Sequence, residues 1–177
     1  MKSLLTCAGA LVAAAGVIFA QSPSVTETKV IAGNTISIKY SSPPVKGQAG
    51  KIFNKGGLIN TQAASYPIWG SIDGPATMFH TDADLDVAGL AVPKGDYTLY
   101  VDLSDPDNWQ LVVNKELHQW GLTYNQPEDV GRVKMNMSKP PALVESLKYT
   151  LTDSGGNKGR LQLAWENHVA SVDFTLK

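Results

Sequence analysis

Cysteine is almost missing from this sequence, since the chain of 177 residues holds a single one, Cys7. Cys7 lies within an N-terminal segment that we expect to be removed, so the mature protein should contain no disulfide and no reactive thiol. A type-1 copper site needs a cysteine thiolate, and the mature chain therefore excludes it. Stability must come from side-chain burial and from backbone hydrogen bonds.

An excess of charge of one sign is also lacking, because 15 Lys and Arg residues face 16 Asp and Glu residues, for a net charge of −1. Such a chain lacks the excess of positive charge that binding to nucleic acid or to an anionic bilayer requires. Phosphate-binding loops, dinucleotide fingerprints and a Gly-x-Ser-x-Gly motif are absent too. The sequence therefore predicts no cofactor and no nucleic-acid partner.

The first twenty residues have the features of a signal peptide. Lys2 supplies a positive start, residues 4–19 form an apolar run, and the small Ala20 precedes Gln21. The run is short for a membrane span, although a retained N-terminal anchor stays open as the alternative. We predict a signal peptide at residues 1–20 and a single domain at 21–177. The protein should be exported to the periplasm or beyond, without membrane insertion after cleavage.

Apolar and polar residues alternate in most of the remaining chain, where no long stretch has helical periodicity. Strands with one apolar and one wet face are typical of antiparallel sheets, and two sheets must face each other to bury the apolar sides. We predict an all-β antiparallel sandwich of about eight to nine strands. Its apolar residues are Ile36, Ile38 and Tyr40; Tyr97, Leu99, Val101 and Leu103; Trp109, Leu111 and Val113; Val133, Met135 and Met137; Leu147, Tyr149 and Leu151; Leu161, Leu163 and Trp165; and Ala170, Val172, Phe174 and Leu176.

Two segments, residues 41–65 and 115–128, lack alternation and hold most of the Gly, Pro and Asn. We interpret them as long loops that pack over an end of the sandwich. Long ordered loops are where a binding site is expected.

The order of short motifs along the chain resembles one bacterial family, the domain of unknown function 2911. The resemblance covers roughly residues 35–176. It implies an exported β-sandwich and brings no established activity. Two departures are Gln48 after Gly47 and Gly70 after Trp69, where the family pattern leads one to expect arginine. The motifs are Tyr40 to Pro43, Val45-Lys46-Gly47, Ile68-Trp69, Ala76-Thr77, the run from Val92 to Leu99, Trp109, Asn114-Lys115, Trp120-Gly121, Tyr124, Asp129 to Val133 and Trp165-Glu166.

A polar series, His80, Asp82, Asp84 and Asp86, is spaced by two residues and would share one face of a strand. We interpret this face as solvated. Calcium-loop spacing fails, because Val87 stands where that loop needs glycine. A metal site built from His80, Asp82 and His118 stays open as a weak alternative, although the histidines, with His168, lie far apart in sequence.

Aromatic side chains beside the loops are the best candidates for ligand contact. Trp69 and Trp120 each precede a glycine, so each ring is either an exposed ligand platform or a plug of a sandwich end. Trp109 and Trp165 fall on apolar strand faces and should be core residues. Our leading hypothesis is a non-catalytic envelope protein that binds a small molecule or a protein through Trp69, Trp120, Tyr124 and Arg132. The alternative is a hydrolase that uses a His/Asp pair, with His80 or His118, or a bound metal at the loop end.

Overall fold

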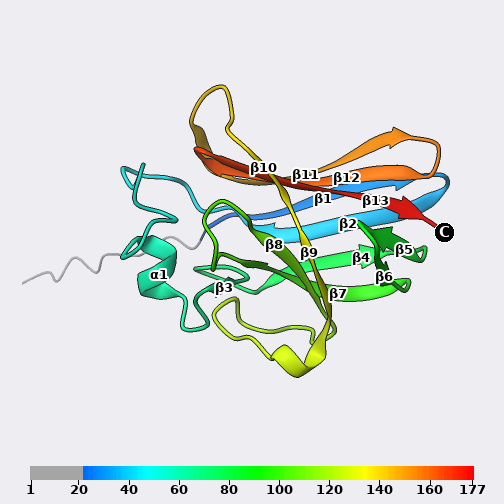
Figure 1. The fold of residues 1–177 in the computed structure, drawn as a ribbon, viewed down its shortest axis with the longest axis horizontal. Coiled ribbons are helices and arrows are strands. Elements are labelled where there is room, and N and C mark those ends of the chain that lie inside the picture. The colour runs from blue at the N-terminus through cyan, green and yellow to red at the C-terminus, as the bar shows by residue number, and fades with distance from the viewer. Residues whose placement is uncertain (1–21) are drawn as a thin grey trace, which may run out of the picture.

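The fold is a sandwich of two antiparallel sheets, as the alternation predicts (Figure 1). The computed structural model describes residues 22–177, and the expected signal peptide lies outside the described residues. The described part of the chain holds thirteen strands rather than eight or nine. The additional strands are mostly short, so that they leave little trace in the alternation pattern.

The first sheet has seven strands in the order β1-β2-β4-β7-β8-β9, and β3 pairs with β7 outside this path. Neighbours along it are antiparallel, and β1 and β2 form a hairpin in which Ile31 lies opposite Asn34. The strands are β1 (Ser24–Ile31), β2 (Asn34–Ser41), β3 (Ile68–Trp69), β4 (Thr77–Thr81), β7 (Gly95–Asp102), β8 (Gln110–Asn114) and β9 (Asp129–Lys134).

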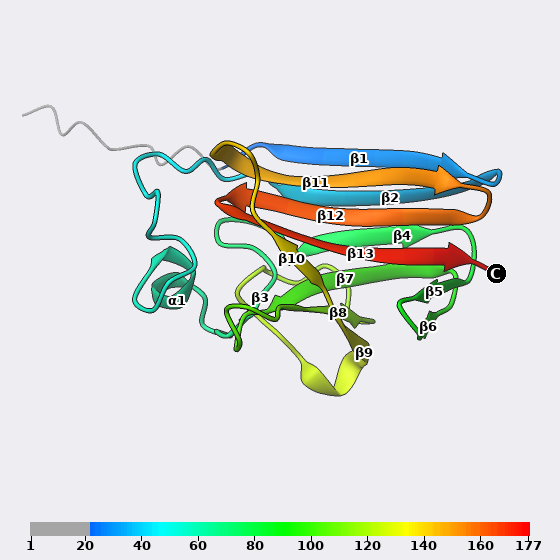
Figure 2. The same cartoon turned by 45° about the horizontal axis from the view of Figure 1, so that its top comes forward.

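The second sheet has six strands in the order β11-β12-β13-β5-β6, and β10 pairs with β13. Figure 2 shows β11, β12 and β13 lying across the first sheet with β1 at one border. These strands are β5 (Leu85–Val87), β6 (Leu90–Val92), β10 (Asn136–Ser138), β11 (Val144–Gly155), β12 (Lys158–Glu166) and β13 (His168–Leu176).

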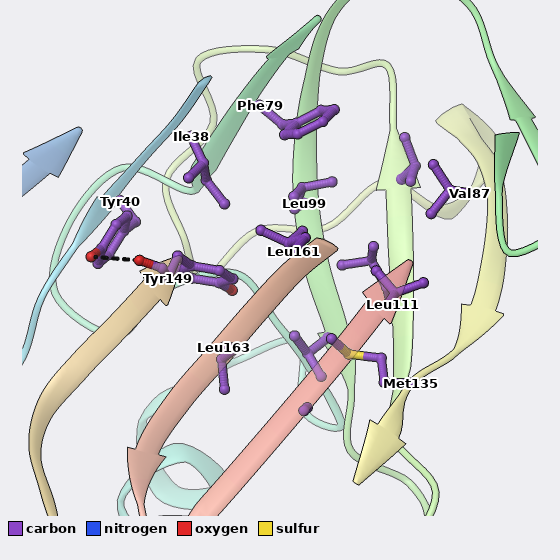
Figure 3. Close-up of a cluster of buried hydrophobic side chains, with 14 of the residues drawn as sticks. Ile38, Tyr40, Phe79, Val87, Leu99, Leu111, Met135, Tyr149, Leu161 and Leu163 are labelled. Atoms are coloured by element: carbon purple, nitrogen blue, oxygen red, sulfur yellow. Dashed lines mark hydrogen bonds between the residues drawn. The ribbon is translucent and has the colours of Figure 1, made fainter. Parts of the chain in front are cut away.

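The core lies between the two sheets, where the predicted apolar faces meet (Figure 3). Leu99, Leu111 and Leu161 are each at most 3% exposed. Tyr40 and Tyr149 pack edge to face at 5.0 Å between ring centroids. Of the predicted apolar residues, only Met137 is not fully buried, and it packs against the edge of the core.

Two segments that the sequence predicts as continuous strands instead pass from one sheet to the other. The series from His80 to Asp86 is divided between β4, in the first sheet, and β5, in the second. The segment around Met135 is divided in the same way between β9 and β10. Alternation persists through both crossings because a residue between two sheets still has one inward side, and Met135 is 1% exposed.

The two predicted loops take different positions. Residues 42–67, which include the short helix α1 (Leu58–Gln62), close one end of the sandwich (Figure 1). We call this the loop end. Residues 115–128, which end in the 3-10 turn η1 (Gln126–Glu128), lie instead against the outer face of the first sheet, where Gln119 and Gly121 hydrogen-bond to residues 71–76.

The outer face of β7 is therefore dry, which corrects the prediction that every strand has one wet face. Tyr100 and Val112 are fully buried there, with Ile68 and Ala76, and the Tyr124 ring lies 5.1 Å from that of Tyr100. No helix among residues 22–177 combines the length and the apolar character needed to cross a bilayer.

Candidate functional site

Two of the four predicted ligand residues, Tyr124 and Arg132, lie side by side on the outer face of the first sheet. The Arg132 guanidinium donates to Asp102 Oδ2 from Nη1 at 2.7 Å and to Asp129 Oδ2 from Nη2 at 3.2 Å. It also donates to the Tyr124 hydroxyl, which in turn donates to Asp129 Oδ2 at 2.5 Å. Both carboxylates and Tyr124 therefore already use the charge and donors of Arg132.

The Arg132 network fastens residues 115–128 onto the sheet. Asn114 extends it by donating to Asp129 Oδ1 and to the Asn125 carbonyl oxygen. Burial, followed by the hydrogen bond to Asp129, raises the pKa of Tyr124 to about 12, so this phenol keeps its proton. Arg132 is the positive centre of a mostly internal cluster, with 27% of its side chain exposed.

The two predicted tryptophans, Trp69 and Trp120, lie in different environments. Trp69 belongs to the core, is 2% exposed and stacks on Trp165 with 5.9 Å between ring centroids. Its ring is therefore an internal packing element, which corrects its selection as a direct ligand contact. Trp120, in contrast, is 49% exposed, in the loop that covers the outer face.

The alternative metal residues are also separated. His80 places Nε2 3.0 Å from Asp82 Oδ1 and Nδ1 2.8 Å from Asp96 Oδ1, on an exposed surface. His118 lines a different cavity of about 660 Å³, together with Met78 and Gln119. Residues 22–177 contain no group of three or more His, Cys, Asp or Glu side chains arranged to hold a metal ion.

A cavity at the loop end joins three segments that lie far apart in the sequence. It has a volume of about 530 Å³, which is within the usual range for small-molecule sites. The loop 42–67, the β7–β8 connection and the β12–β13 turn all contribute to its walls. We call it the end pocket, and its principal wall residues are Gly50, Phe53, Tyr66, Trp109, Glu166 and His168.

Aromatic rings form one side of the end pocket. The His168 imidazole stacks on Trp109, with ring centroids 5.2 Å apart and planes 15° apart. Phe53 packs edge-on against His168 at 4.8 Å and contacts Trp109 at 4.7 Å. Behind them, the buried Nε1 atoms of Trp69 and Trp165 have no hydrogen-bond partner among the described residues. This side of the pocket is therefore rich in aromatic rings.

A buried carboxylate faces the same cavity. Glu166 is 2% exposed, its Oε1 accepts a hydrogen bond from the Gly50 N–H, and its Oε2 lies 3.8 Å from His168 Nδ1. Burial lowers the pKa of His168, more than the nearby Glu166 raises it, which favours the neutral imidazole. No Lys or Arg side chain of residues 22–177 forms an ion pair with Glu166.

The backbone at Glu166 is unusual for its residue type. Trp165 and His168 pair across a two-residue turn formed by Glu166 and Asn167. Glu166 has a φ of +54°, in the left-handed region that glycine or asparagine favours. Such conformations persist where the surroundings impose them, and they gather at functional sites. The turn holds a charged side chain in the cavity at a conformational cost.

Sequence reasoning did not select the end pocket. Trp109 is correctly predicted as a core residue, and it also contributes to the wall of the cavity. Phe53 stands in a loop without periodicity, and His168 is one of three scattered histidines. The one local signal is an acidic residue in a tight turn between two alternating strands, and this signal is common at ordinary surface hairpins.

Comparison with known proteins gives a family without an assigned activity. The family model described as "Protein of unknown function (DUF2911)" matches residues 22–174, which is nearly all of the described chain. No curated protein and no solved structure matches the chain. Because the family model spans both sheets and all three segments of the end pocket, we conclude that the chain belongs to the DUF2911 family.

Proposed function

We propose that this protein is an exported, non-catalytic binding protein that takes a small organic molecule into the end pocket. The observation that carries the proposal is a cavity of about 530 Å³ whose wall combines Phe53 and Trp109 with the buried carboxylate of Glu166 and the partly buried imidazole of His168. A mainly apolar wall with few polar groups is the usual composition of a ligand site.

The polar groups of the pocket support binding rather than packing. A buried carboxylate costs free energy unless it is well paired, and Glu166 receives one backbone hydrogen bond and faces a neutral imidazole. A buried His168 Nδ1 has no hydrogen-bond partner among the described residues. A ligand that supplies a donor to either group would remove part of this cost.

The residues of the Arg132 network take a structural role in this proposal. Arg132 and Tyr124 hold residues 115–128 in place, and they lie on the outer face rather than at the loop end. Trp120, which is half exposed, is available to a partner, so a protein ligand at that surface remains an extension of the proposal.

A hydrolase draws less support from the geometry. Both ring nitrogens of His80 contact carboxylates, which favours a charged imidazolium over a general base. Within residues 22–177 no Ser or Thr hydroxyl is hydrogen-bonded to a histidine, and Ser104 Oγ, at the end pocket, donates to Asp102.

Export to the periplasm or beyond is part of the proposal and rests on the sequence. The apolar N-terminal run ends at a small residue, and β1 begins at Ser24, shortly after the expected cut. The nearly neutral charge argues against nucleic acid as a partner.

The proposal is tested by blocking the pocket. Purified protein is screened by NMR against a library of neutral, cationic and anionic fragments, and we expect binders to shift the backbone amides of Phe53, Trp109 and His168. Ser104→Trp should abolish these shifts, because Ser104 is an exposed wall residue. Ser154→Trp, at the exposed opposite hairpin, is the matched control and should leave them intact. An absence of binders, or equal shifts in both variants, would contradict the proposal.

A further inference from the structure

We propose that the ligand of the end pocket is an organic cation, an amine or quaternary ammonium compound, held by the Glu166 carboxylate against the partly exposed rings of Phe53 and Tyr66. This inference rests on the proposed function and specifies its ligand class.

The first step is the charge of the pocket. Glu166 is the buried acid of the cavity wall, and its nearest titratable neighbour is His168, whose burial favours the neutral form. The cation on the wall is Lys55, which is exposed and forms no ion pair with Glu166. Lys139 acts on His168 from outside the wall. The interior therefore has a negative centre, which rejects anions and attracts cations.

The second step is the wall around that centre. Aromatic faces attract cations through the negative potential above the ring, and the effect grows when water is excluded. Trp109, Phe53 and Tyr66 line the same cavity as the carboxylate. An alkylammonium group meets both needs, because its charge faces Glu166 while its methyl or methylene groups cover the rings.

The third step separates an organic cation from a metal ion. A hard metal ion is held by about six oxygen ligands, with several carboxylates among them, whereas Glu166 is the one acidic residue among those that line this cavity. The volume of about 530 Å³ also exceeds what a bare ion would fill and suits a molecule of several heavy atoms.

The fourth step is the position of the carboxylate. The turn at Glu166 sets the direction in which its side chain leaves the backbone, and the hydrogen bond from the Gly50 N–H to Oε1 holds the carboxylate before any ligand arrives. Oε2 remains directed toward His168 Nδ1 at 3.8 Å, a distance longer than a hydrogen bond. A preorganised acceptor reduces the entropy cost of binding.

The test compares choline with 3,3-dimethylbutan-1-ol, which has the same shape but no charge. Calorimetry and tryptophan fluorescence should show choline binding about tenfold or more tightly than the alcohol, a difference that corresponds to the cation–π and ionic contributions. Glu166→Gln should weaken choline binding by a similar factor. Glu145→Gln, which removes the same charge from an exposed position on β11, should not change it.

A second variant covers the case in which Glu166→Gln fails to fold. Lys55→Met removes the competing positive charge and should raise choline affinity by about two- to fivefold, in line with a screened charge at the rim. Equal binding of choline and the alcohol, or no effect of either substitution in folded protein, would overturn the cation inference. If neutral fragments bind the end pocket while choline does not, the pocket stands and its ligand class is wrong. If no fragment binds, the proposed function itself fails.

Discussion

His80 shows how a single side chain links two parts of the fold. Its ring lies between Asp96 on β7 and Asp82 in the crossing from β4 to β5. The hydrogen bond to Asp96, and then that to Asp82, raise the pKa of His80 above its usual 6.5. The protonated ring therefore fastens the crossing to the sheet.

The His80 contact should make stability depend on pH. Because the folded pKa is raised, the stabilisation is complete below about pH 6.5 and is lost as the pH rises through the higher folded value. The group is exposed, so we expect only about 0.2–1 kcal/mol. Urea unfolding of His80→Gln should show a smaller loss of stability than the wild type between about pH 5.5 and pH 8.5.

Comparison of the variant with the wild type isolates His80. His168 works in the opposite direction, because burial lowers its pKa and its protonation at low pH opposes folding. Identical pH profiles for His80→Gln and the wild type would show that the two carboxylates do not stabilise the charged ring.

At the scale of elements, the segment 115–128 and the strands under it form one unit. Gly121 and Gly70 allow the close approach: a Cβ atom at Gly121 would lie 2.2 Å from Ser71 Cβ, and one at Gly70 would lie 2.8 Å from the Tyr100 ring. Arg132 then joins β7, β9 and the loop through Asp102, Asp129 and Tyr124.

Arg132→Met should therefore destabilise the protein strongly. It leaves Asp102 and Asp129 without their shared cation, at a cost of up to about 3–5 kcal/mol for a buried pair. Arg160→Met removes an exposed ion pair with Asp173 and should leave the free energy of unfolding nearly unchanged. Denaturant unfolding measures both. Equal effects would mean that the Arg132 network is not a structural fastening, and the original hypothesis of a ligand contact would gain support.

The strands were predictable wherever one face meets the core. Leu111 and Val113 on β8, like Leu161 and Leu163 on β12, lie in the core with their polar neighbours outside. β1 escaped prediction because it is a border strand whose side chains are mostly exposed or half-buried, so that no apolar side stands out. β5 and β6 have three residues each, too few for alternation to be distinctive.

The end pocket was not predictable for a different reason. Its carboxylate, imidazole and rings come from the segments around Phe53, Trp109 and Glu166, which are brought together by the pairing of distant strands. Each residue has an ordinary local role in the sequence: loop aromatic, core tryptophan, turn acid. Arg132 and Tyr124, two of the four residues predicted to contact a ligand, do lie together, but the two acidic partners that define their role depend on strand register.

At the scale of the whole molecule, the residues just before β1 contact a distant segment of the chain. Ser22 is fastened to Asp73 through both its backbone N–H and its hydroxyl. The first strand follows at Ser24.

Export of the precursor should remove about 20 residues from its N-terminus. Mass spectrometry of protein recovered from the envelope or medium of an expressing bacterium should give a chain that starts at Gln21 or within a few residues of it. That protein should also unfold at the same temperature with and without a reductant, because Cys7 would have left with the signal. Recovery of the uncut chain from the cytosol would contradict the export proposal.

The dry outer side of β7 limits how far this protein can be trimmed. Shortening residues 115–128 would expose Tyr100 and Val112 to solvent, because that segment now covers them. A contiguous exposed apolar surface on a small protein promotes self-association. Residues 115–128 therefore also limit self-association, and variants with a shortened segment should aggregate while their strands are still formed.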